Sequence, residues 1–381
     1  MTGVSTWAAL LPVLQAEWHT SNTIAGVVSG AFFAGYLAAV PVLVSLTDRV
    51  PARRVYICSC GALACGAIGF ALGTGPATAM VFQAVLGAGL AGTYMPGLKE
   101  LSDRIVGPRQ GRAIAFYTST FGIGTSLSLF VSGLLQRHFG WRAAFLAGAV
   151  GPLLAAALMR RLPPAPRVSP ASRSSLSFRS VLRDRRVLGY VIGYTAHCWE
   201  LFALRSWLVA FLGYAATGVS IAPSTIAAAV NLLGPPASIA GNEIAAGRRV
   251  RMVRYTMFAG AALAFGMGLT ARRGSLIVIA VTAAYVITIM GDSAALTAGL
   301  VETSDPAARG TVMAVYSFFG FGGGLLGPIV FGTLLDAGGG TASHRAWILA
   351  FASLTAVSLL GAASLTARSA ALGAKQKITV D

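Results

Sequence analysis

Apolar segments about as long as a membrane-spanning helix recur along almost the whole sequence. A helix needs about 20 consecutive apolar residues to cross a bilayer. Only 11% of the residues are charged, against about 25% in a soluble domain. The sequence therefore predicts an all-α polytopic membrane protein. Eleven segments have the required length: 22–46, 55–73, 76–98, 112–136, 143–159, 187–213, 219–241, 252–271, 274–300, 310–335 and 346–367.

A twelfth apolar segment, 2–15, is shorter than the others. It would cover only about 20 Å at ~1.5 Å per residue. A signal peptide has basic residues before its apolar segment, and none precedes this one. We interpret it as a truncated first span, from either a misplaced start codon or a degraded copy of the protein.

The basic residues indicate how the chain is oriented. Of 29 Lys and Arg, 23 fall in alternate gaps between the spans, 5 fall in the other gaps, and Arg205 lies inside a span. Because basic residues are retained on the cytoplasmic side, the C-terminus and the longest loop are expected in the cytoplasm, and the protein in the inner (plasma) membrane. The net charge of +17 is spread over short loops, which does not favour nucleic-acid binding.

The longest loop, 160–186, is rich in Pro, Ser and Arg and has the composition of a linker. It separates a predicted six-helix bundle, 1–159, from a second one, 187–367, and residues 368–381 form a predicted cytoplasmic tail. The halves repeat each other: GRAIAFY (111–117) matches GTVMAVY (310–316), and Gly133 matches Gly332 at the same offset. Parallel repeats of six helices are typical of transporters.

Two local motifs strengthen this interpretation. The gap after the second span reads LTDRVPARR (46–54), and the fourth span contains QAVLGAGLAG (83–92). With these motifs the chain resembles the major facilitator superfamily (MFS) over essentially its whole length. The resemblance implies an MFS fold of 12 spans in two six-helix pseudo-repeats, and transport by alternating access. It also implies a gating loop that braces one state, formed by Asp48, Arg49, Arg53 and Arg54.

The chain departs from the family pattern in places. Gln83 stands where the family has an arginine, and Pro51 and Ala52 replace a usual glycine and a usual basic residue. The second-half counterpart of the loop, GNEIAAGRR (241–249), is more degenerate. Three further segments resemble the cyanate and nitrate/nitrite permease-like branch: YMPGLKELSDR (94–104), HCWELFALRSW (197–207) and GDSAALTAG (291–299).

Ionisable residues inside spans are expensive and therefore functional candidates. His197 and Glu200 lie about 60° apart on one helix face, whereas Arg205 is about 140° from Glu200. Arg205 is expected to meet an anion, either Asp292 in the empty state or the substrate; the alternative is that it extends to water near the end of its span. The resemblance places these groups on cavity-lining helices. The predicted substrate-binding set is Arg205, Asp292, His197, Glu200, Trp199, Ser293, Thr297, Gln83 and Tyr94.

The sequence also bears on mechanism. It has no G-x-x-x-x-G-K-[ST] motif for ATP, so we expect a permease without cofactors, driven by a gradient and acting as a monomer on a small solute. Since Gln83 cannot change its charge, proton symport would have to use Glu200, Asp292 or His197. A uniporter, an exchanger, and a non-transporting sensor or inactive relative stay open as alternatives. A membrane enzyme or an electron-transfer subunit is a further alternative. Quinone or haem chemistry would need paired histidines within spans, which four histidines, three of them in or beside loops, do not favour.

Three other residue types have ordinary roles in this interpretation. The four cysteines have no metal-binding spacing and are expected to act as small apolar residues. The six tryptophans lie mostly near predicted span ends and are expected to mark the membrane interface. Pairs such as Gly323-x-x-x-Gly327 predict close helix packing.

Overall fold

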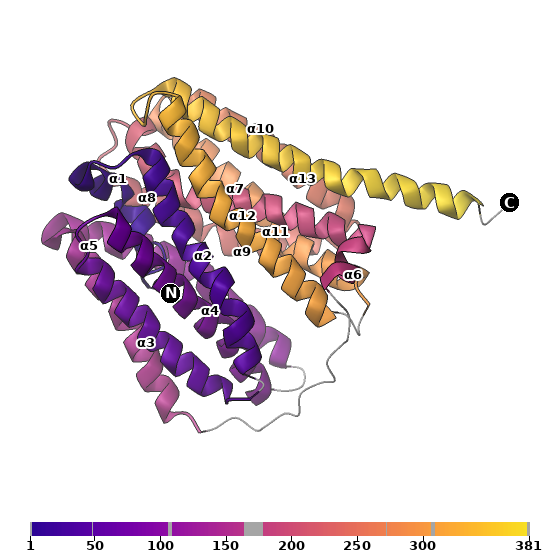
Figure 1. The fold of residues 1–381 in the computed structure, drawn as a ribbon. Helices are drawn as coiled ribbons and strands as arrows, with labels where there is room; N and C mark the ends of the chain where they lie inside the picture. The colour runs from indigo at the N-terminus through magenta and orange to yellow at the C-terminus, as the bar shows by residue number, and fades with distance from the viewer. Residues whose placement is uncertain are drawn as a thin grey trace. The chain divides into compact units, whose positions relative to one another are not determined.

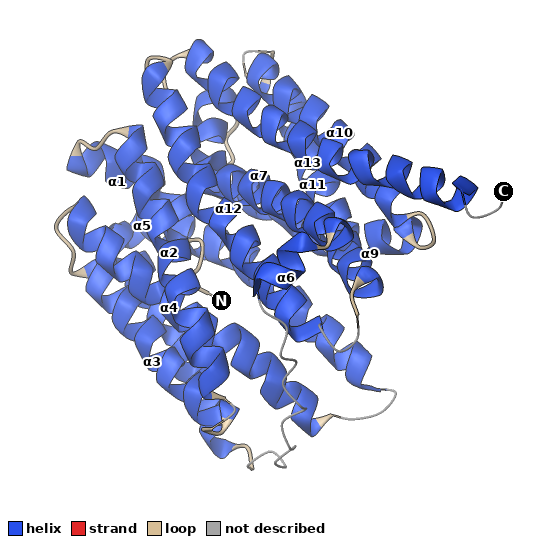
Figure 2. Ribbon diagram, turned by 45° about the vertical axis from the view of Figure 1, so that its right-hand side comes forward, coloured by secondary structure: helices blue, strands red, loops and turns tan. Residues whose placement is uncertain are grey.

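The computed structural model describes residues 2–47, 49–105, 109–163, 178–271, 273–305 and 309–378. Helices make up its regular structure, and no strand occurs within these ranges (Figure 2). The helices are labelled along the chain in Figure 1. Their bounds are α1 Thr6–Trp18, α2 Asn22–Leu46, α3 Ala52–Ala71, α4 Pro76–Arg104, α5 Gln110–Arg161, α6 Phe178–Arg183, α7 Arg185–Ala215, α8 Pro223–Leu232, α9 Gly234–Ala245, α10 Arg249–Thr270, α11 Ser275–Thr303, α12 Arg309–Ala337 and α13 His344–Ile378.

Apolar length explains most of these helices. Eight helical segments in the described ranges are long and apolar enough to cross a membrane. The predicted span 22–46 coincides with α2, whose start is capped by Ser21: its hydroxyl accepts a hydrogen bond from the Ile24 amide at 3.2 Å. The short first segment forms α1, a helix of 13 residues.

The predicted spans 112–136 and 143–159 lie in the two parts of α5, which are separated by a non-helical kink at Gly140, where φ is 80° and ψ is 168°. One predicted span needs correction. The single span 219–241 is broken into α8 and α9 at Leu233, because Pro235 and Pro236 at the start of α9 have no backbone N–H for a helix that continues from α8. If α5 is divided at Gly140, α8 and α9 are joined and the short α6 is set aside, the described helices make twelve segments.

The chain divides into two compact units. The first contains residues 1–172, 205–213 and 218–232, and the second contains residues 173–204, 214–217 and 233–381. The predicted bundles 1–159 and 187–367 stay a prediction. Residues 164–177 of the predicted linker lie outside the described residues. The last part of the linker contains α6 and the first two residues of α7. The predicted tail 368–381 overlaps the end of α13.

In the first unit, α4 packs against α2 and α3, while α5 packs against α1, α3 and α8. An aromatic cluster joins the helix ends: the Phe70 and Phe145 rings stack at 3.8 Å between centroids, and Trp141 lies edge-on to both. Trp141 also donates a hydrogen bond from Nε1 to Glu17 Oε2 at 2.6 Å. Trp141 is buried in this cluster, and its expected place at the membrane interface stays a prediction.

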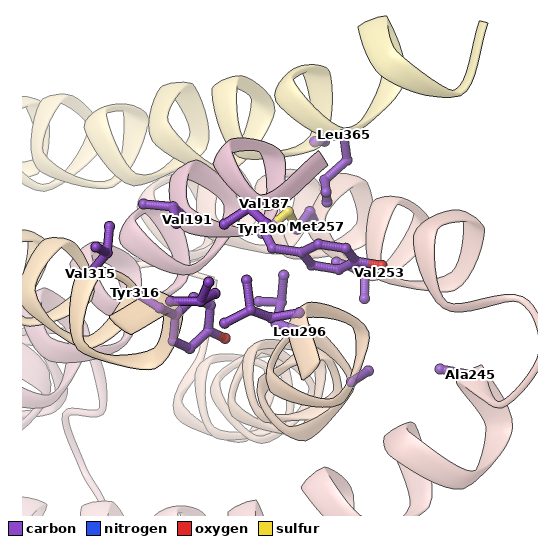
Figure 3. Packing of buried hydrophobic residues seen from close by; sticks show 14 of the residues in the cluster. Val187, Tyr190, Val191, Ala245, Val253, Met257, Leu296, Val315, Tyr316 and Leu365 are labelled. Atoms are coloured by element: carbon purple, nitrogen blue, oxygen red, sulfur yellow. The ribbon is translucent and has the colours of Figure 1, made fainter. Parts of the chain in front are cut away.

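In the second unit, α10 packs against α11 and α13, and α9 packs against α11. Its hydrophobic core draws on α7, α10, α11, α12 and α13 (Figure 3). Val187 and Tyr190 of α7 face Val253 and Met257 of α10 there. Trp347 of α13 is fully buried and stacks on Tyr214. It is thus a core residue, and its expected place at the membrane interface stays a prediction.

Candidate functional site

The second unit brings His197 and Asp292 together, as a pair that the sequence did not identify. His197 lies in the middle of α7 and Asp292 in the middle of α11, and both side chains are buried. Nδ1 of His197 is 2.7 Å from Oδ1 of Asp292. The two atoms are not aligned for a hydrogen bond, and neither has another hydrogen-bond partner among the described residues. The contact is an ion pair when both ring nitrogens of His197 carry a proton.

Glu200 lies one turn after His197 on α7 and is equally buried. Its Oε1 accepts a hydrogen bond from the Tyr285 hydroxyl of α11 at 2.7 Å. A Cβ atom added at Gly260 of α10 would lie 3.4 Å from the same oxygen. The carboxylate thus reaches the interior between α7, α10 and α11, and its hydrogen bond to Tyr285 offsets part of the cost of burying it.

Aromatic rings flank the His197–Asp292 pair. The Tyr194 ring is parallel to the His197 ring, with 5.8 Å between centroids, and stacks on Tyr316 of α12 at 3.9 Å. The Tyr316 hydroxyl is 3.2 Å from Oγ1 of Thr297. Thr297 in turn donates to the carbonyl of Ser293 at 3.3 Å. The predicted residues Ser293 and Thr297 are therefore linked by contacts to Tyr316 and Tyr194. Sequence reasoning missed both tyrosines.

Trp199 lies on α7 at a close contact with α12. A Cβ atom at Gly327 would lie 2.6 Å from the Trp199 carbonyl oxygen, so only glycine fits there. Glycines four residues apart, such as Gly323 and Gly327, let two helix backbones come close. The indole Nε1 of Trp199 is buried and has no hydrogen-bond partner among the described residues. The role of Trp199 in substrate binding stays a prediction.

The first unit holds the other predicted residues. Arg205 is half-buried, and its Nε donates to Oδ1 of Asn231 on α8 at 3.2 Å. Its Cζ atom lies 6.0 Å from the centroid of the Phe121 ring, which also meets the Tyr94 ring edge-on at 5.8 Å. The expected contact between Arg205 and Asp292 joins the two units and stays a prediction. Gln83 is buried in α4.

Asn231 and Phe121 were missed by sequence reasoning. A polar amide inside the predicted span 219–241 was a signal for Asn231. Phe121 had no comparable signal, because a phenylalanine inside an apolar span is indistinguishable from its neighbours.

The predicted gating loop is only partly described. Asp48 lies outside the described residues. Nη2 of Arg53 donates to the carbonyl oxygen of Arg160, while Arg49 and Arg54 are exposed. In the second-half counterpart, Arg249 Nε lies 2.8 Å from Oε2 of Glu302 at the end of α11. Ion pairing thus occurs in the segment where the family motif is more degenerate.

Metal chemistry has little support in these ranges. Within the described residues, no group of three or more His, Cys, Asp or Glu side chains could hold a metal ion. The described chemistry is that of buried ion pairs, hydrogen bonds and aromatic rings.

Known proteins resemble this chain in sequence. The putative niacin/nicotinamide transporter NiaP of Bacillus subtilis is 27% identical over 181 residues, which cover 44% of this chain and 42% of that protein. The niacin transporter NiaP of Acinetobacter baylyi is 26% identical over 162 residues, covering 42% and 34%. These alignments span less than half the length of either relative. The resemblance to the cyanate and nitrate/nitrite permease-like branch stays a prediction.

Solved structures share the fold. A bacterial homolog of the human lysosomal transporter Spinster, crystallised in an inward-facing and unoccupied conformation, matches with a TM-score of 0.72 and 16% identity, covering 96% of this chain and 92% of that one. The nucleoside transporter NupG matches with a TM-score of 0.75 and 13% identity, covering 95% and 96%. The family model of the Major Facilitator Superfamily matches residues 1–328. This chain therefore belongs to the Major Facilitator Superfamily, as a multi-pass membrane protein of a transporter family.

Proposed function

We propose that this chain moves a small organic or inorganic anion across the inner membrane by alternating access, in symport with protons. The observation that carries the proposal is the buried pair of His197 and Asp292. Of the ordinary side chains, histidine is the one whose charge changes near physiological pH. A carboxylate 2.7 Å away, imperfectly aligned, provides a second proton acceptor in the same place. The family supplies the framework for transport.

Arg205 supports an anionic substrate. Arg205 donates to the amide oxygen of Asn231 and lies over the Phe121 ring. A guanidinium presents a planar fork that suits carboxylates and other oxyanions. One relative is named as a niacin transporter and another as a putative niacin/nicotinamide transporter, and niacin is a pyridine carboxylate. Tyr94 and Phe121 would supply the apolar surface for such a ring.

Proton coupling is tested by measuring solute uptake into proteoliposomes with and without an imposed pH gradient, using niacin and a panel of small carboxylates and inorganic anions. The wild type should take up its solute faster with the gradient. Asp292→Asn should lose this stimulation, because an amide cannot serve as the proton acceptor beside His197. Asp336→Asn, the same change at an exposed residue of α12, should keep it. Wild-type uptake that ignores the gradient would point to a uniporter or exchanger.

The anion is tested in the same vesicles with Arg205→Lys and Arg205→Gln. Both variants should lose substrate binding, the lysine variant because a point charge does not replace the bidentate fork. Full binding by the glutamine variant, or uptake of neutral or cationic solutes alone, would rule out the anion. No flux of any solute by the folded protein would favour a sensor or an inactive relative.

A further inference from the structure

Three arginines at the start of α10 have no ionic partner among the described residues. Arg248 immediately precedes the helix, and Arg251 and Arg254 follow in its first two turns. Arg249, between them, is paired with Glu302. Within the described residues the charge of Arg249 is therefore compensated inside the protein, whereas those of its three neighbours are not.

Arg254 has an unsatisfied donor. Its side chain is half-buried, and its Nε atom has less than 1 Å² of accessible surface and no hydrogen-bond partner in the described ranges. Leaving a charged donor without an acceptor is unfavourable. Arg251 lies three residues earlier, so that the two guanidinium groups are neighbours on the helix surface. Because Arg251 is exposed and Arg254 is partly exposed, one external anion would reach both side chains.

The same face of α10 continues as an apolar strip. Its exposed residues recur every three or four positions, which places them on one side of the helix. The opposite side carries Val253 and Met257 into the core of the second unit (Figure 3). The helix therefore presents a long apolar surface with a basic end. The strip consists of Tyr255, Phe258, Ala262, Phe265 and Leu269.

We propose that Arg251 and Arg254 bind the phosphate of an anionic membrane phospholipid, with an acyl chain along the strip of α10. The guanidinium fork matches phosphate oxygens in a bidentate manner. α10 is one of the helices long and apolar enough to cross a membrane, so the strip meets lipid. This end of α10 is also the one predicted to be cytoplasmic, where anionic lipids attract basic side chains. The strip favours a lipid over free phosphate, which has no apolar part.

The proposal is tested by native mass spectrometry of the purified full chain, titrated with phosphatidylglycerol or phosphatidylcholine. The wild type should bind phosphatidylglycerol preferentially. Arg251→Gln with Arg254→Gln should weaken that binding by about tenfold or more, because both guanidinium–phosphate contacts are lost. Arg185→Gln with Arg186→Gln removes the same charge at the start of α7 and should leave it unchanged.

A second variant guards against misfolding. Arg254→Lys keeps the charge but loses the fork, and should bind phosphatidylglycerol with intermediate affinity. Equal binding by the wild type and the Arg251/Arg254 double variant would overturn the proposal, as would equal binding of the two lipids by the wild type. Inorganic phosphate that binds as tightly as phosphatidylglycerol would show a free-anion site and reject the lipid.

Discussion

At the scale of single residues, Glu200 depends most clearly on one partner. Its carboxylate is buried between helices and accepts the Tyr285 hydroxyl at 2.7 Å. Tyr285→Phe removes the donor and leaves a buried carboxylate oxygen without it. We expect this to destabilise the protein by about 1–3 kcal/mol, measured by thermal unfolding in detergent.

The control for this prediction is Tyr255→Phe, the same change at an exposed tyrosine of α10. It should leave the unfolding temperature unchanged. If Glu200→Leu is combined with Tyr285→Phe, the second change should cost less than it does alone, because no carboxylate is left to satisfy. Equal losses of stability in the two tyrosine variants would contradict the importance of this hydrogen bond.

At the scale of helices, the contact between α7 and α12 depends on glycine. A Cβ atom at Gly327 would lie 2.6 Å from the carbonyl oxygen of Trp199, a backbone atom that cannot move away by itself. Gly327→Leu should therefore push α12 from α7, lower the unfolding temperature and abolish flux. Gly322→Leu is the matched control, because nothing lies within 4 Å of the Cβ position at Gly322 on the same helix. Similar behaviour of the two variants in unfolding and flux measurements would refute the packing argument.

At the scale of the whole molecule, the arginine distribution predicts how the chain lies in the membrane. A fluorescent reporter fused after Asp381 should fluoresce and a phosphatase there should be inactive, because the C-terminus is expected in the cytoplasm. A phosphatase inserted at Gly340, in the turn between α12 and α13, should be active, since α13 separates that turn from the C-terminus. The reverse pattern would overturn the orientation.

Sequence reasoning predicted the helices better than their interruptions. The span 22–46 was correct because a long apolar segment in lipid must satisfy its own backbone groups as a helix. The break at Leu233 was missed because residues on both sides of it are apolar, although Pro235 and Pro236 were visible. In the candidate site, His197 and Asp292 were identified as buried ionisable groups. Their pairing could not be predicted, because a helical pattern shows which face a residue lies on but not which helix faces it.

The sequence by itself determined that this protein is a helical membrane protein of the MFS family, because hydrophobic length, charge distribution and family motifs are all local patterns. Only the tertiary structure decided which buried groups meet. His197 meets Asp292, and Glu200 accepts a hydrogen bond from Tyr285. These contacts join residues 95 and 85 positions apart in the sequence. Such pairs depend on how α7 packs against α11. That packing is set by the summed fit of many side chains, which no single segment of the sequence contains.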